Sequence, residues 1–213
     1  MRRLLETFLR KAQPQPSITP IVYSPKVDVN AAFWREVEAR RPARVLEAGV
    51  LQSVPGRPTH QKGRFSGIAD KDYVRIDIEA GADVDVVADL HRLPEDWTNA
   101  FDGFIASAVF EHLERPWIAA QEVARVLRPG GLFLVSTHQS FPLHGYPSDF
   151  FRFSREALQL IFEDAGLTVS AADYQHRCAI VPPAGLVAQG HLAGWNETFP
   201  SFILVEATGF KPA

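Results

Sequence analysis

Short apolar runs alternate with polar or helically spaced segments along most of the chain. The apolar runs have the length of buried strands, and turn residues bound them. Strands are predicted at residues 44–50, 73–78, 84–88, 101–109, 132–137, 167–174 and 202–208. Near-continuous apolar runs are typical of parallel strands covered on both faces, so the pattern indicates an α/β fold.

Between these runs, apolar residues recur at the spacing of amphipathic helices. Helices are predicted at residues 31–41, 117–127 and 154–165. Asp28 or Asn30 can cap the first helix, Ser154 can cap the last, and Gly166 ends it. Residues 51–71 include Pro55, Gly56, Pro58 and Gly63, so this connection is predicted to be a loop with at most a short helix.

The start of the chain differs in composition from the rest. Residues 1–42 are predicted to form a helical and proline-rich cap, and residues 43–213 the main domain. Leucines and a phenylalanine within residues 4–9 would form one face of a short amphipathic helix. That helix could lie on a membrane surface or pack on a neighbouring subunit of a homodimer, but covering the domain is the expected role. No stretch is long enough to span a bilayer.

Composition narrows the classes of partner. The chain has 213 residues, and its formal net charge of -3 offers no electrostatic case for nucleic acid or an anionic membrane as the main partner. The single cysteine, Cys178, excludes an internal disulfide and a cysteine zinc cluster. A reduced, cytoplasmic setting is therefore expected. No two histidines have the helical spacing, with a nearby acid, that zinc enzymes use, so no metal site is predicted.

Acidic side chains stand at the ends of two successive predicted strands. Asp77 and Glu79 lie at the end of the strand at 73–78, and Asp89 follows the strand at 84–88. In an open α/β sheet, ligands bind in the crevice at the carboxyl ends of the strands. Carboxylates there can hold a ribose diol or the edge of an adenine, which points to a nucleoside-bearing cofactor.

Six phrases, in order, resemble the class I S-adenosylmethionine-dependent methyltransferases, and in particular their type 11 group. They are VLEAG, RIDIEAG, VADLHRLP, FDGFIASAVFEHL, ARVLRPGG and LFLVSTH, and the match covers residues 44–167. The resemblance implies a three-layer Rossmann-like α/β fold with a mainly parallel seven-stranded sheet and an antiparallel late strand. It also implies S-adenosyl-L-methionine as the cofactor.

The resemblance also implies which residues hold the cofactor. Asp77 would accept hydrogen bonds from both ribose hydroxyls, and Asp89 from the adenine amino group. Alternatively, Asp89 only caps a turn. The remaining candidates are Glu47 and Gly49 toward the methionine end, Ile78, Glu79 and Leu90 beside the adenine, and Ser107, with Ala108, near the sulfonium. Glu47 could instead pair with an arginine inside the protein, and Gly49 could be a simple strand-end turn.

One feature departs from the family pattern. Val50, Leu51, Gln52 and Ser53 stand where further glycines are usual, so the glycine-rich loop is largely lost. Two functions from different classes therefore stay open. The chain is expected to be an active methyltransferase, or else a non-catalytic binding or scaffold protein. A nicotinamide dehydrogenase is disfavoured, because GxGxxG is absent after the first strand.

Candidate catalytic residues follow the fourth and fifth predicted strands. A general base is needed only if the methyl acceptor is a weak nucleophile such as a sugar hydroxyl. His138, His112 and His144 are the candidates, although His112 could simply pack beside the cofactor. The phrase FPLHGYPSDFFRFSREAL resembles a bacterial branch often associated with glycan pathways, so a small-molecule or glycan-pathway acceptor is expected. In that phrase Arg152 is expected to pair with Asp149, and its aromatic residues mostly to pack the loop.

Overall fold

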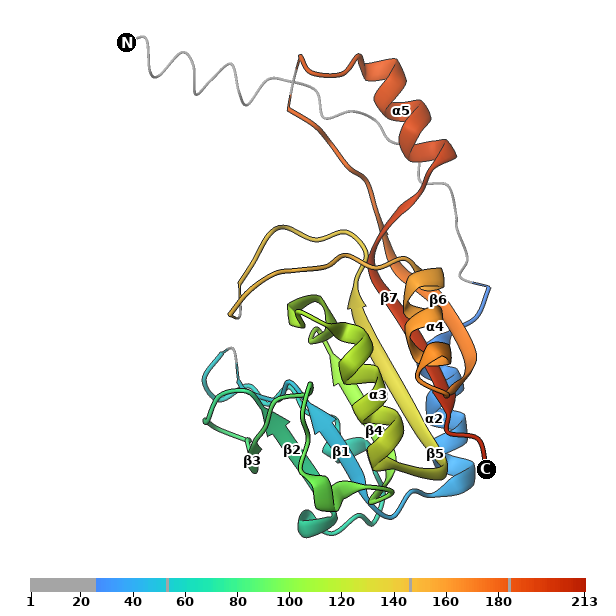
Figure 1. The fold of residues 1–213 in the computed structure, drawn as a ribbon. Helices are drawn as coiled ribbons and strands as arrows, with labels where there is room; N and C mark the ends of the chain where they lie inside the picture. The colour runs from blue at the N-terminus through green and yellow to red at the C-terminus, as the bar shows by residue number, and fades with distance from the viewer. Residues whose placement is uncertain (1–25, 53, 146, 184) are drawn as a thin grey trace.

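A single seven-stranded sheet forms the centre of the protein (Figure 1). The computed structural model describes residues 26–52, 54–145, 147–183 and 185–213, so the predicted amphipathic helix near the N-terminus lies outside the described residues. The strand order is β3-β2-β1-β4-β5-β7-β6. Strands β1 to β5 run parallel, whereas β7 is antiparallel to both of its neighbours. The predicted fold class, with its antiparallel late strand, is confirmed.

The strands lie where the apolar runs predicted them. Their bounds are β1 Val45–Ala48, β2 Tyr73–Asp77, β3 Val86–Val87, β4 Phe101–Ser107, β5 Leu127–His138, β6 Thr168–Cys178 and β7 Ser201–Phe210. The third strand is much shorter than the predicted run, because it pairs with β2 only through its two residues at the sheet edge. β5 begins earlier than predicted. Its first residues include the expected turn, where Gly130 donates its N–H to the carbonyl oxygen of Lys211.

Helices cover both faces of the sheet and make it a three-layer structure (Figure 1). On one face, α3 (Pro116–Val126) and α4 (Arg155–Asp164) pack over the central strands around buried Phe104, Phe133 and Phe162. On the other face, α2 (Val29–Arg40) contributes Phe33 and Trp34 to a second apolar cluster. The sequence placed α2 in the N-terminal cap, yet this helix packs on the sheet of the main domain.

Side-chain caps fix the ends of two helices as the sequence predicted. The Asp28 carboxylate accepts from the N–H of Ala31 at 2.8 Å and starts α2. The Ser154 hydroxyl oxygen accepts from the N–H of Ala157 at 3.1 Å and starts α4, and Gly166 follows that helix at a φ of 83°. Each cap satisfies one of the main-chain donors that a helix leaves open at its first turn.

The connection after β1 is a long loop, as its prolines and glycines predicted. It contains two short 3-10 helices, η1 (Lys62–Arg64) and η2 (Asp70–Asp72). Two further 3-10 helices, η3 (Glu95–Trp97) and η4 (Phe110–His112), precede and follow β4. Among the described residues, the connections from β1 to β2 and from β3 to β4 therefore contain 3-10 turns and no α-helix.

The proline- and glycine-rich segment between β6 and β7, where the sequence predicted no element, contains α5 (Gln189–Thr198). Both strands extend beyond the sheet body, and α5 stands at the end of this extension, away from the other helices (Figure 1). The helix was missed because neighbouring prolines and glycines hid a short helical run. No helix among the described residues is long and apolar enough to cross a membrane.

Candidate active site

One cavity of about 710 Å³ opens at the carboxyl edge of the parallel strands. Volumes of this size are typical of small-molecule and cofactor pockets. Its lining crosses the tips of β1, β2, β4 and β5 and the segment after β3, which is where ligands bind in open α/β sheets. It brings together most of the predicted site residues: Gly49, Asp77, Ile78, Glu79, Asp89, Leu90, Ser107, His112, His138 and His144.

Gly49 ends β1 in a conformation that other residues seldom adopt. Its φ is 76°, and its N–H donates to the carbonyl oxygen of Ile76 at 3.0 Å. A Cβ at this position would lie 2.2 Å from a methyl carbon of Val109. Glycine is therefore required both by the backbone angle and by the close approach of the segment after β4. Gly49 and Val109 therefore form a tightly packed turn in the wall of the cavity.

The carboxylate of Asp77 lies in the cavity lining at the tip of β2. Its Oδ2 accepts the N–H of Leu51 at 2.9 Å, and its Oδ1 accepts the N–H of Glu79 at 3.3 Å. A carboxylate has about four acceptor positions, so lone pairs remain for a ligand. The loop that lacks the usual glycines is thus tied to the acid predicted to bind ribose.

Asp89 also faces the cavity, and the turn-capping role weighed from the sequence is visible too. Its Oδ1 accepts the N–H of His91 at 2.9 Å and lies 2.7 Å from the Nδ1 of the same histidine. Burial would raise the pKa of Asp89, but the hydrogen bonds from His91 outweigh it and lower the pKa. The other carboxylate oxygen has no hydrogen bond among the described residues. Capping and ligand binding are therefore compatible at Asp89.

Glu47, by contrast, does not line the cavity. Its side chain points to the α2 side of the sheet, is buried, and accepts the Tyr73 hydroxyl at 2.5 Å and the N–H of Gln61 at 2.9 Å. Burial raises the pKa of Glu47 to about 7 despite these hydrogen bonds and the charge of Arg75. The structure gives Glu47 a role in holding the loop before η1 to β1 and β2, and its predicted contact with the cofactor stays a prediction.

Three histidines line the other part of the cavity, beyond the tips of β4 and β5. His112 belongs to η4, His138 ends β5, and His144 lies in the loop before α4. The Nδ1 of His112 lies 2.6 Å from the carbonyl oxygen of Ser148. A carbonyl only accepts hydrogen bonds, so this nitrogen carries the proton and Nε2 keeps its lone pair in the neutral ring.

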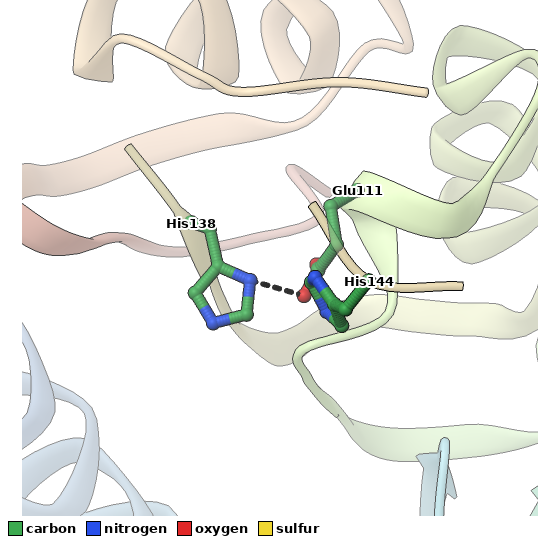
Figure 2. A group of neighbouring side chains, drawn as sticks. All are labelled: Glu111, His138 and His144. Carbon is green, nitrogen blue, oxygen red and sulfur yellow. Dashed lines mark ion pairs between the residues drawn. The ribbon is translucent and has the colours of Figure 1, made fainter. Parts of the chain in front are cut away.

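Glu111 joins two of these histidines, His138 and His144, as Figure 2 shows. Its side chain is fully buried, its Oε1 lies 2.6 Å from the Nδ1 of His138, and its Oε2 accepts the Thr137 hydroxyl at 2.6 Å. Burial alone would raise the pKa of Glu111, but His138 and Thr137 outweigh it and lower the pKa. A buried, ionised carboxylate beside a cavity is costly unless a partner charge offsets it.

The loop between β5 and α4 is held by the ion pair that the sequence predicted. Arg152 donates two hydrogen bonds to the carboxylate of Asp149, at 2.5 and 2.8 Å. The same guanidinium donates to the carbonyl oxygens of Phe141, Pro142 and Phe151. Phe153 is buried, as predicted for packing, whereas Phe141 stacks on His138 at a ring distance of 4.2 Å and lines the cavity. Tyr146 lies outside the described residues.

Two residues of this site were not singled out from the sequence. Glu111 stands beside His112 in a phrase that resembled the family, but only the fold shows that its carboxylate turns toward the end of β5. Leu51 had been noted only as a replacement for a glycine, yet its N–H binds Asp77. A buried acid in an apolar run is the signal that could have pointed to Glu111.

Sequence comparison agrees with this geometry. The model of a family described as "Methyltransferase domain" matches residues 64–135, from the loop before β2 into β5. Residues 64–135 are therefore similar to a methyltransferase domain, and the chain has the fold of class I methyltransferases. The resemblance to class I S-adenosylmethionine-dependent methyltransferases is thereby confirmed. No curated protein matches the chain in a sequence search.

Several solved structures share the fold at low sequence identity. A Burkholderia thailandensis 1,6-didemethyltoxoflavin-N1-methyltransferase, solved with that compound and S-adenosylhomocysteine, has a TM-score of 0.56 and 14% identity, over 100% of this chain and 87% of that one. The methyltransferase in a Haloferax volcanii complex with the Trm112 activator has a TM-score of 0.52 and 20% identity, over 87% of this chain and 92% of that one. The [4+2]-cyclase SpnF has a TM-score of 0.53 and 19% identity, over 80% of this chain and 76% of that one. At these identities the likeness shows the fold.

Proposed function

We propose that this protein transfers a methyl group from S-adenosyl-L-methionine to a small-molecule or glycan-pathway acceptor. The observation that carries the proposal is the single cavity in which Asp77 and Asp89 line one part and three histidines line another. Carboxylates at neighbouring strand tips suit the ribose and adenine of an adenosine. When bound, the cofactor supplies an electrophilic methyl group on its sulfonium.

The residues that line the cavity suit both the adenosine part and the methionine part of the cofactor. Asp77 and Asp89 both keep free acceptor positions, with Ile78, Glu79 and Leu90 beside them in the lining. At the tip of β1, the absence of a side chain at Gly49 lets Val109 approach closely, and both residues line the cavity. S-Adenosylmethionine has no phosphates, so the lost glycine loop is not needed as a phosphate cradle.

At the acceptor end, the histidines supply the candidate proton acceptors. Of the three, His112 has its tautomer fixed by Ser148, which leaves Nε2 available to take a proton from an acceptor hydroxyl. Ser107, at the end of β4, lies in the lining between the carboxylates and the histidines. Most of the catalysis then comes from aligning the acceptor with the methyl group, and the protein's own residues do this by shaping the cavity.

Isothermal titration calorimetry with S-adenosylmethionine and S-adenosylhomocysteine tests the proposal. Wild-type protein is expected to bind both ligands in the micromolar range. Asp77→Ala should weaken binding by about 100-fold, since a charge-assisted hydrogen bond is lost. Asp96→Asn, at an exposed acid in η3, is the matched control and should bind as the wild type does. No heat of binding at millimolar ligand would reject the methyltransferase.

A second candidate function, that of a non-catalytic scaffold, is supported by the contact between Leu51 and Asp77. Leu51 occupies a position where a glycine is usual, lines the cavity, and already binds the Asp77 carboxylate. A chain that had lost cofactor binding could serve as a non-catalytic binding or scaffold protein with the same fold. The same titration separates the two functions, because a scaffold of this kind would bind neither ligand.

The setting and assembly of the protein belong to the same proposal. The lone Cys178 supports a cytoplasmic location. Exposed Trp195 and Phe199, on and next to α5, support a homodimer. Light scattering of the purified protein, compared with a Trp195→Ala variant, would show a dimer that the substitution weakens.

A further inference from the structure

Three side chains of ligand type converge beside the cavity from different parts of the chain (Figure 2). Glu111 comes from η4, His138 from the last position of β5, and His144 from the loop that follows. One ligand atom from each lies within 4.8 Å of the others. Donor atoms that share a zinc ion lie about 3–3.5 Å apart, given bond lengths of about 2.0–2.2 Å. A movement of about 1.5 Å at the loop residue His144, with a slight widening of the 2.6 Å separation between Glu111 and His138, would complete such a set.

Within the part of the chain that the structure describes, each of the two buried members of this set has one atom without a hydrogen bond. The Oε1 of Glu111 and the Nδ1 of His138 are 2.6 Å apart, yet neither makes a hydrogen bond of acceptable geometry. The contact between them is a histidine–carboxylate ion pair whose alignment is too poor for a hydrogen bond. Glu111 is 0% exposed and His138 6% exposed, so water does not readily satisfy these atoms. Buried polar atoms in this condition call for a partner.

The surrounding contacts orient the set in the way that metal ligands are oriented. The Nδ1 of His144 lies 3.1 Å from the carbonyl oxygen of Pro142, which leaves Nε2 as the atom able to bind an ion. Thr137 donates its hydroxyl to the Oε2 of Glu111, so Oε1 is the oxygen that lies beside His138. Metal-binding histidines and carboxylates usually have such outer partners, which fix the ring tautomer and the direction of the lone pair.

From these observations we infer that Glu111, His138 and His144 bind a divalent first-row transition metal ion, such as Zn²⁺. Two imidazoles and one carboxylate suit this class of ion, whereas Mg²⁺ and Ca²⁺ prefer sites made of oxygen ligands. Three protein ligands leave coordination positions open, as in catalytic metal sites. Because His138 and His144 line the cavity, those positions are accessible to a ligand of that cavity. Metal binding is independent of the proposed methyl transfer.

The test is metal titration of the full chain after treatment with a chelator. Calorimetry with ZnCl₂ and visible absorption with CoCl₂ should both show one ion per chain, with a Kd in the micromolar range or tighter. Glu111→Gln and His138→Ala should each weaken Zn²⁺ binding by about 100-fold or more. His191→Ala, at an exposed histidine on α5, is the control and should leave binding unchanged.

A further variant distinguishes a specific metal site from nonspecific binding, and its circular dichroism spectrum shows whether it is folded. Thr137→Val removes only the outer hydroxyl contact and should weaken Zn²⁺ binding by about tenfold, with an unchanged near-ultraviolet circular dichroism spectrum. The inference is overturned if the wild type binds neither ion, or if His191→Ala weakens binding as much as His138→Ala does. It is also overturned if Mg²⁺ competes equally, since that would show an unselective acidic site.

Discussion

The carboxylate of Asp77 accepts a hydrogen bond from the main-chain N–H of Leu51, 26 residues earlier in the chain, at 2.9 Å. This contact ties the loop after β1 to the tip of β2. The loop has Val50, Leu51 and Gln52 where the family resemblance implies glycines, and the contact holds it against the cavity. Asp77 is therefore both a structural residue and the proposed ribose ligand.

Substitutions at Asp77 should separate these two roles. Asp77→Asn keeps an oxygen that can accept from Leu51, whereas Asp77→Ala removes it. Hydrogen bonds to charged groups contribute about 1.5–3 kcal/mol, so Asp77→Ala should lower the free energy of unfolding by about that amount and Asp77→Asn by less. Chemical denaturation measures both. Equal losses in the two variants would show that the contact with Leu51 does not hold the loop.

Replacement of Gly49 by alanine should strongly destabilise the folded protein. Alanine at a φ of 76° is strained, and its Cβ would meet Val109. We expect a loss of about 2 kcal/mol or more in unfolding free energy, together with weaker cofactor binding. Gly56→Ala has a similar φ but open space around the Cβ, so it is the matched control for the steric part. Thermal unfolding of the two variants compares them, and equal shifts would contradict the role assigned to Val109.

The buried acid Glu47 predicts how stability depends on pH. Its pKa is raised from 4.5 to about 7 in the folded protein by burial. The folded state thus holds a proton that the unfolded chain releases. The stability that this group contributes is complete below pH 4.5 and is lost as the pH rises to about 7, by about 2–4 kcal/mol.

Glu47→Gln should remove that loss while keeping an oxygen for Tyr73 and Gln61. Unfolding free energies measured between pH 5 and 8 should therefore fall less steeply in this variant than in the wild type. Glu38→Gln, at an exposed position on α2, serves as the control and should follow the wild-type curve. Parallel curves for Glu47→Gln and the wild type would show that this carboxyl is already ionised in the folded state.

Arg152 should control the order of the loop that contains His144. Its guanidinium binds both oxygens of Asp149 and three carbonyl groups, a set that lysine cannot reproduce. The neighbouring Arg152 also holds the pKa of Asp149 below its usual range. Arg152→Lys should lower the thermal midpoint by several degrees and speed hydrogen exchange in residues 139–145.

The control for this prediction is Arg35→Lys, at an exposed position on α2. Because His144 is part of the loop that Arg152 holds, Arg152→Lys should also weaken Zn²⁺ binding by about tenfold without removing a ligand. Faster exchange with unchanged Zn²⁺ affinity would show that the position of His144 is set by contacts other than Arg152.

His112 should matter for catalysis and not for cofactor affinity. His112→Gln removes the nitrogen proposed to accept a proton while filling similar space. If the acceptor is a hydroxyl, the turnover rate should fall by about 100-fold or more, and the Kd for S-adenosylhomocysteine should stay within about twofold. Methylation assays over acceptor classes, with calorimetry in parallel, measure both quantities. An unchanged rate with every acceptor would remove His112 from the mechanism.

Local patterns were enough to determine much of this protein. The apolar runs gave the strand positions, and their order, together with the family resemblance, indicated the sheet and its antiparallel late strand. Asp28 and Ser154 were recognisable as helix caps, since a cap depends on a few neighbouring residues. Asp77 and Asp89 could be assigned to one edge of the sheet, because parallel strands place their carboxyl ends together. The short helix α5 was missed because nearby prolines and glycines hid a run too short to form a stable helix by itself.

Other features depend on contacts between distant residues, and only the tertiary structure decided them. The sequence cannot show that Glu47 turns away from the cavity to meet Tyr73, because residues on one strand alternate between two faces whose partners come from elsewhere. Nor can it show that Glu111, His138 and His144 meet, since no local spacing relates an η4 residue to a strand end and a loop. Spacing rules detect metal ligands on one helix or turn, whereas here the sheet itself brings the ligands together.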